Sequence, residues 1–129
     1  MRLTVCLAFG TILFTAFGAY ADCSKRPIKH SWNIHSSDQR ISGDYVAKLV
    51  TGKRVRFGKT GSENYGADGS YFYQDSAGKY QAIGVKFYND GSRCIHYANG
   101  PRYDLYVANA GQLVLINRGG GRFEGKVTK

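Results

Sequence analysis

The chain has 129 residues, of which 43% are hydrophobic, and a formal net charge of +9. A chain of this length forms one small domain, and its excess of lysine and arginine predicts attraction to polyanions. The sequence contains no heptad pattern, long repeat or low-complexity linker, which excludes coiled-coil and solenoid architectures.

Residues 1–21 have the three parts of a secretory signal peptide. Arg2 provides the positive start, residues 7–17 the apolar centre, and Ala19 and Ala21 the small residues that signal peptidase recognises. A transmembrane anchor is the alternative, but the apolar run is too short to span ~30 Å of hydrocarbon. We therefore expect cleavage after Ala21 and a periplasmic or secreted chain without a transmembrane segment.

Cleavage would remove Arg2 and Cys6, which leaves a net charge of +8 and two cysteines, Cys23 and Cys94. An even number of cysteines in an exported chain predicts a disulfide. This bond would close a loop of about 70 residues and contribute roughly 4 kcal/mol to stability in the chain-entropy model. The alternative is a metal site built on Cys94 and His96, but two ligands do not make one. We expect no metal and no cofactor.

Residues 22–40 are polar and basic, and we expect an N-terminal arm that lies on the domain through Trp32 and Ile34. Residues 41–52 follow with the one helical pattern of the chain. Ser42 can cap the start, the apolar residues of the segment fall on one face, and Gly52 can end it. A helix of this length must pack against other elements to be stable.

Residues 53–58 change to a period of two, because Val55 and Phe57 alternate with Arg54 and Arg56. This is the pattern of a strand with one solvent-exposed face. From residue 65 to residue 116, short aromatic and β-branched runs alternate with turns rich in Asn, Asp and Gly. Residues 113–116 are apolar on both faces and should be central or covered by the helix, whereas residues 123–127 should form a last edge strand.

These patterns predict an all-β, mainly antiparallel fold over residues 41–129. We expect a small meander barrel or sandwich of about six to eight strands with one short helix.

The placement of the nine acidic residues argues against an enzyme. Four lie in turns or a helix cap, where they have local structural roles: Asp44, Asp68, Asp75 and Asp90. Glu63, Asp104 and Glu124 remain on predicted strands, and the best acid–base pair is Glu63 with His96. A small secreted hydrolase or toxin of the nuclease type would need His96 or His35 beside Glu63 in a cleft rich in arginine. We assign no catalytic residue.

Tyrosine is concentrated in the meander, since eight of the ten tyrosines lie between Tyr65 and Tyr106. Tyr71 and Tyr73 share one strand face. They either cover the core and keep their hydroxyls in water, or form an aromatic platform for a sugar or a partner protein.

Arg54 and Arg56 should face solvent side by side and attract an anionic ligand. We therefore predict Arg54, Arg56, Tyr71 and Tyr73 as binding residues. Basic residues among tyrosines also suit single-stranded nucleic acid, but export argues against that partner. The expected partners of an exported binding protein are anionic polysaccharide, lipopolysaccharide or an acidic protein.

Four segments carry a resemblance to a known group: residues 49–57, the stretch YGADGSY at 65–71, Arg93-Cys94 and residues 113–117. Over about 75 residues the chain resembles small exported proteobacterial proteins without known activity. The group tends to carry a second cysteine where Tyr103 stands here, and this departure supports Cys23 as the partner of Cys94. The resemblance implies fold and compartment and no catalytic residue.

Overall fold

The computed structural model describes residues 22–129, so the predicted signal peptide lies outside the described residues. In chain order the elements are β1 (Gln39–Arg40), α1 (Gly43–Val50), β2 (Arg54–Phe57), β3 (Gly61–Tyr65), β4 (Tyr71–Asp75), β5 (Gly78–Gln81), β6 (Gly84–Phe87), β7 (Ser92–Tyr97), β8 (Gly100–Asn109), β9 (Gln112–Asn117) and β10 (Arg122–Thr128). All strand pairs are antiparallel and the described part holds one short helix, which confirms the predicted class.

The described residues form ten strands rather than six to eight. The two additional strands are β1 and β5, whose sequences are short and polar and therefore lack the alternation that reveals the others. Both lie at the margin of the sheet, because β1 pairs only with β8 and β5 only with β4.

The sheet has the order β5-β4-β3-β2-β10-β9-β8-β7-β6. β10 joins its two halves, since residues 122–125 pair with β9 and residues 126–128 pair with β2. The prediction that residues 123–127 form an edge strand is therefore wrong. The last strand returns between β9 and β2, with its first half hydrogen-bonded to β9 and its second half to β2.

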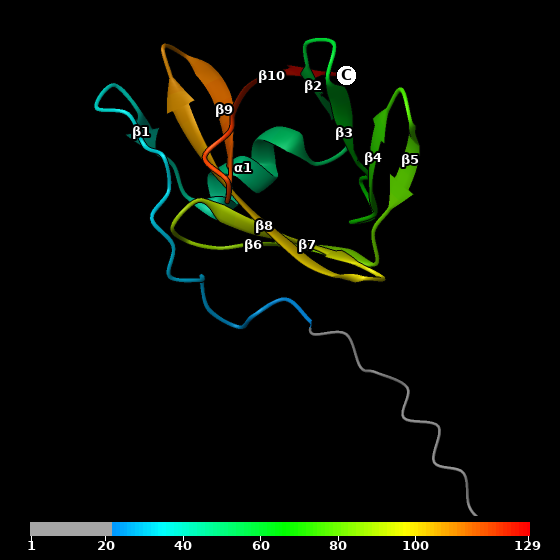
Figure 1. Ribbon diagram of the computed structural model, residues 1–129. Coiled ribbons are helices and arrows are strands. Elements are labelled where there is room, and N and C mark those ends of the chain that lie inside the picture. The colour runs from blue at the N-terminus through cyan, green and yellow to red at the C-terminus, as the bar shows by residue number, and fades with distance from the viewer. Residues whose placement is uncertain (1–21) are drawn as a thin grey trace, which may run out of the picture.

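The sheet curls into a half-barrel that surrounds its core (Figure 1). The two-residue link between β5 and β6 brings the ends of the sheet together. The amide of Ala82 donates to the carbonyl oxygen of Tyr71 at 3.0 Å, and the amide of Ile83 donates to that of His96 at 2.7 Å. One residue therefore bonds to β4 and the next to β7.

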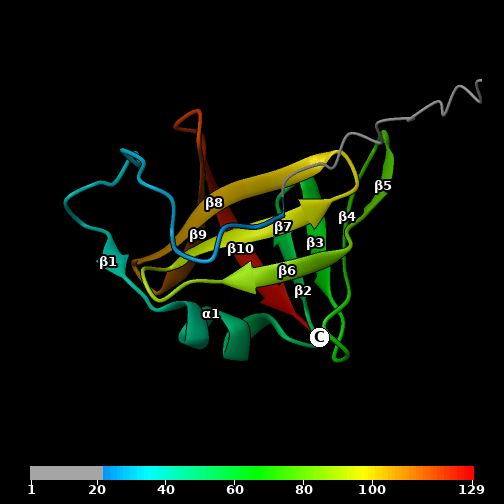
Figure 2. The same cartoon turned by 90° about the horizontal axis from the view of Figure 1, so that it is seen from below.

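Helix α1 lies across one end of the half-barrel (Figure 2). Ser42 caps it as predicted, because its hydroxyl accepts a hydrogen bond from the amide of Tyr45 at 3.2 Å. Val46 and Val50 are fully buried in the core. Gly43 is required at the start of the helix, since a Cβ there would collide with the backbone oxygen of Tyr88.

Hydrophobic residues are buried on both faces of β9. Leu113 and Leu115 point into the half-barrel with Val55, Phe57, Ile95 and Tyr106. Val114 and Ile116 point outward and pack with Leu105, Val107 and Trp32. The prediction of a strand apolar on both faces is confirmed, and the cover on the outer face is the N-terminal arm rather than the helix.

The arm is held on the outer face at both of its ends. Cys23 is bonded to Cys94 of β7, with 5.8 Å between their Cα atoms. Asp38 accepts hydrogen bonds from both terminal nitrogens of Arg122, at 2.7 and 2.8 Å, and these bonds hold the pKa of its carboxyl well below the usual range. Trp32 packs on the sheet as expected, whereas Ile34 is exposed.

The disulfide should be a large part of the stability of this small domain. Replacing Cys23 by Ser removes the cross-link while leaving the more deeply buried Cys94 in place. We expect a loss of about 2–4 kcal/mol in unfolding free energy, because a loop spanning 71 residues is released in the unfolded chain. Urea unfolding with and without reductant measures it. Reductant should lower the unfolding free energy of the wild type to that of the variant and leave the variant unchanged. Two titratable thiols in the native wild type would contradict the disulfide.

Candidate functional site

A charged side chain lies in the centre of the half-barrel. On β7, Arg93 shares its inward face with Ile95 and Tyr97, while Cys94 points outward to the arm. Arg93 is only 2% exposed and is the largest fully buried side chain of the described residues. A buried cation is stable only where carboxylates and hydrogen bonds surround it.

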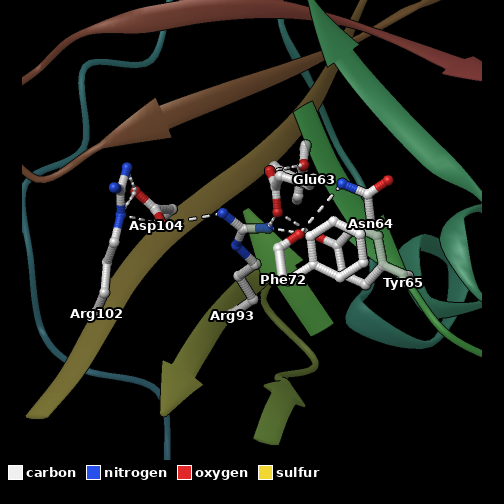
Figure 3. Close-up of polar contacts among 8 residues, drawn as sticks. Glu63, Asn64, Tyr65, Phe72, Arg93, Arg102 and Asp104 are labelled. Atoms are coloured by element: carbon white, nitrogen blue, oxygen red, sulfur yellow. Dashed lines mark hydrogen bonds and ion pairs between the residues drawn. The ribbon is translucent and has the colours of Figure 1, made fainter. Parts of the chain in front are cut away.

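Arg93 contacts carboxylates from both halves of the sheet (Figure 3). One terminal nitrogen, Nη1, donates to Glu63 of β3 and to the hydroxyl oxygen of Tyr65. The other, Nη2, donates to Asp104 of β8 at 3.1 Å. We call the group the Arg93 cluster; its members are Glu63, Tyr65, Arg93, Arg102, Asp104 and Tyr106.

Two tyrosines complete the coordination of Glu63. The hydroxyls of Tyr65 and Tyr106 each donate to one of its carboxylate oxygens at 2.6 Å. Burial raises the pKa of both phenols, so they remain neutral hydrogen-bond donors. Glu63 is 1% exposed, and its charge is met by one cation and two neutral donors.

Arg102 connects the cluster to solvent. Its side chain is 50% exposed, and its Nε and Nη2 atoms donate to the two oxygens of Asp104 at 3.0 and 3.2 Å. Burial favours loss of its proton, but the charge and hydrogen bonds of Asp104 outweigh that effect and raise the pKa of Arg102. The cluster thus holds two cations and two carboxylates, which balance.

A cavity of about 330 Å³ opens beside this cluster, at the end of the half-barrel opposite α1. We call it the turn-end cavity, because it lies where the β2–β3, β4–β5 and β9–β10 turns gather. It is lined by Phe57, Thr60, Glu63, Tyr71, Tyr73, Asp75, Arg93, Arg102, Leu115, Asn117 and Phe123. The Nε of Arg93 is buried and has no acceptor within residues 22–129.

The outer face of the same half of the sheet is basic. We define the basic face as four exposed residues: Arg54 and Arg56 of β2, Lys59 of the β2–β3 turn, and Lys126 of β10. Arg56 stands directly opposite Lys126 in the strand register, and Arg54 stands opposite Asn64. None of the five ion pairs in the described part of the chain involves a residue of this face.

The four predicted binding residues lie on opposite faces of one sheet. Arg54 and Arg56 are exposed while Val55 and Phe57 are buried, as the alternation predicts. Tyr71 and Tyr73 share a face, as expected, and that face is the inner one, where both rings pack on the core and line the turn-end cavity. Tyr71 is 2% exposed, so it neither keeps its hydroxyl in water nor forms an external platform. The two pairs cannot contact the same part of a ligand.

The candidate acid–base pair does not form. Glu63 points inward to Arg93, whereas His96 lies on the outer face of β7 with its Nδ1 3.1 Å from a carboxylate oxygen of Asp22. His35 is in the exposed arm, where its backbone amide bonds to Asp38. Strand alternation explains the result, because Arg93 and His96 are three positions apart on β7 and must face opposite ways.

Sequence reasoning missed Arg93, Asp104 and Arg102 as members of a site. A signal existed for Arg93, since it occupies an inward position of a strand whose other inward residues, Ile95 and Tyr97, are apolar or aromatic. On β8, Arg102 and Asp104 share the inward face with Tyr106. The outward residues Cys94 and Leu105 are also buried, under the N-terminal arm. Because β7 and β8 have apolar residues on both faces, their sequences do not show which face points inward.

Comparison of the chain with protein-family models, with curated proteins and with solved structures finds no match. Within residues 22–129, no helix has the length and apolar character needed to cross a membrane. The same residues contain no group of three or more metal-ligating acidic, histidine or cysteine side chains.

The Arg93 cluster should be energetically coupled. Arg93→Met leaves Glu63 and Asp104 buried without their shared cation, and we expect a loss of about 3–5 kcal/mol in unfolding free energy. Glu63→Gln should also destabilise the protein. The double variant should lose less than the sum of the two single effects, by about 1–3 kcal/mol. Arg54→Met is the exposed control and should change stability by less than about 0.5 kcal/mol. Additive effects in urea unfolding would contradict the coupling.

Proposed function

We propose that this protein is an exported binding protein that attaches to an anionic polysaccharide through the basic face. The single observation that carries the proposal is the set of unneutralised cations on a regular sheet surface. Arg56 and Lys126 are directly opposite each other with no acidic partner. Like charges in such positions destabilise a sheet, so their presence favours a role in binding an anion.

The polar neighbours of these cations favour a sugar over a lipid. Ser62 and Asn64 lie on the same outer face as the cations and offer hydroxyl and amide groups to sugar hydroxyls. The Nε of Arg54 donates to the amide oxygen of Asn64 at 2.8 Å, which holds the guanidinium against β3. The exposed large hydrophobic residues of the described chain lie elsewhere: Ile34, Tyr45, Tyr80 and Ile83. A lipid partner would require an apolar contact surface.

Export is proposed on three grounds. Residues 1–21 follow the signal-peptide pattern, the resemblance noted above is to exported proteins, and Cys23 and Cys94 are bonded. Disulfides persist in oxidising compartments and are rare in the cytosol. An anionic polymer outside the membrane is then the natural partner of a basic domain.

The alternative function, a small secreted hydrolase or toxin, would need a histidine beside Glu63 and clustered arginines around it. Glu63 instead has Arg93 and two tyrosines as neighbours, and His96 contacts Asp22 on the other side of the sheet. Because Glu63 and His96 lie on opposite sides of the sheet, the structure supports binding better than catalysis.

Replacing Arg54 and Arg56 together by Ala should weaken binding to alginate, an anionic polysaccharide, at least tenfold at low salt. The loss of two contacting cations should also make binding less dependent on salt. Both side chains are exposed, so the unfolding free energy should change by less than about 1 kcal/mol. Calorimetric titration at several salt concentrations measures affinity and salt dependence together.

The matched control is the pair Lys48→Ala and Arg118→Ala, which removes equal charge from exposed positions on the helix and the β9–β10 turn. Lys86 is unsuitable as a control because its ammonium donates to backbone oxygens of Ser24 and Lys25 and so holds the arm. If both double variants bind alginate equally weakly, net charge alone determines the affinity and the basic face is not a binding site. Tighter binding to lipopolysaccharide vesicles or to polyglutamate than to alginate would contradict the polysaccharide assignment.

A further inference from the structure

The turn-end cavity has features of a ligand site that is separate from the basic face. Alternation on β2 places Arg54 and Arg56 outside and Phe57 inside, so the two sites lie on opposite faces of this strand and meet only where Thr60 and Asp75 border both. We propose that this cavity binds a small uncharged amphipathic molecule, with an aromatic or branched apolar body and a carbonyl or amide oxygen.

The walls of the cavity suit the apolar body. Phe57, Tyr71, Leu115 and Phe123 supply ring and aliphatic surface, and Tyr73 adds a further ring at the side. Its volume of about 330 Å³ is about twice that of the engineered cavity of ~150 Å³ that binds benzene. Ligand pockets begin at about 300 Å³, so a two-ring molecule is the appropriate size.

The polar side of the cavity calls for a hydrogen-bond acceptor. The Nε–H of Arg93 is a buried donor without an acceptor in the described chain. Such groups are rare because leaving one unpaired is costly. Arg102 also lines the cavity, and its hydrogen bonds to Asp104 use only Nε and Nη2, which leaves Nη1 available. A ligand oxygen in the cavity can accept a hydrogen bond from this free Nη1 of Arg102, next to the buried guanidinium of Arg93.

The charge balance favours an uncharged acceptor over a carboxylate. Within the cluster, Arg93 and Arg102 are already matched by Glu63 and Asp104. Asp75 adds one more negative charge to the lining of the cavity. A carboxylate would therefore bring a second unbalanced negative charge into the site, whereas a carbonyl oxygen accepts the same hydrogen bonds without it.

The β2–β3 turn borders the turn-end cavity. Thr60 is exposed where it lines the cavity, and its carbonyl oxygen accepts a hydrogen bond from the hydroxyl of Tyr73 at 3.3 Å. The next residue is Gly61, and a Cβ there would collide with that hydroxyl. A bulky side chain at position 60 should therefore obstruct the opening and leave the buried cluster undisturbed.

The test uses three probes of nearly equal size: 2-naphthamide, 2-naphthoate and naphthalene. Calorimetry and ¹⁵N and methyl NMR shifts of the disulfide-bonded protein measure affinity and location. We expect saturable one-to-one binding of 2-naphthamide, with shifts at Leu115, Thr60 and the Nε–H of Arg93. Naphthalene, which lacks the oxygen, should bind at least tenfold more weakly, and 2-naphthoate should bind no more tightly than the amide.

Thr60→Trp should reduce the affinity for 2-naphthamide at least tenfold. Gln112→Trp, which introduces the same side chain at an exposed position beside the helix, should leave it unchanged. Failure of all three probes to bind at millimolar concentration would overturn the proposal, as would affinity that Thr60→Trp leaves unchanged. Tighter binding of 2-naphthoate would overturn the uncharged-ligand assignment. None of these outcomes depends on alginate binding by the basic face.

Discussion

The architecture depends on one buried cation. Arg93 on β7 bonds to Asp104 on the neighbouring strand and to Glu63 on β3, which belongs to the other half of the sheet. β10 joins those halves on one side and the short link through Ala82 joins them on the other. Arg93 and the hydrogen bond from Tyr106 to Glu63 span the interior between them. Because removing one partner of a buried ion pair costs several kcal/mol, the stability of the curled sheet depends strongly on this residue.

Strand alternation then assigns different chemistry to the two faces of the sheet. Along β2, the inward residues Val55 and Phe57 enclose the core and the turn-end cavity, while Arg54 and Arg56 present charge to solvent. On β9 the same alternation serves packing on both faces, since the arm covers the outer residues. The disulfide and the Asp38–Arg122 pair keep the arm on the β7–β9 surface, which leaves the basic face uncovered.

Local patterns predicted the all-β class, the helix with its Ser42 cap, and the exposure of Arg54 and Arg56, because each depends on residues close in sequence. The central position of β10 and the Arg93 cluster depend on pairing between distant strands, which periodicity does not encode. Glu63 and Arg93 are 30 positions apart, and only the curled sheet brings them into contact. Local alternation predicts that Tyr71 and Tyr73 share one face, and only the curled sheet decides that this face covers the core rather than forming an external platform.

The hydrogen exchange of the Arg93 Nε–H is the decisive measurement, because the rate reports whether solvent reaches this cation. In ¹⁵N-labelled protein, the signal is assigned by its disappearance in Arg93→Lys. The account predicts exchange slower than that of the exposed Arg54 and Arg56 side chains by at least a hundredfold. Exchange at the rate of those exposed arginines would show that Arg93 is solvated, and would contradict a closed ion cluster at the centre of the half-barrel.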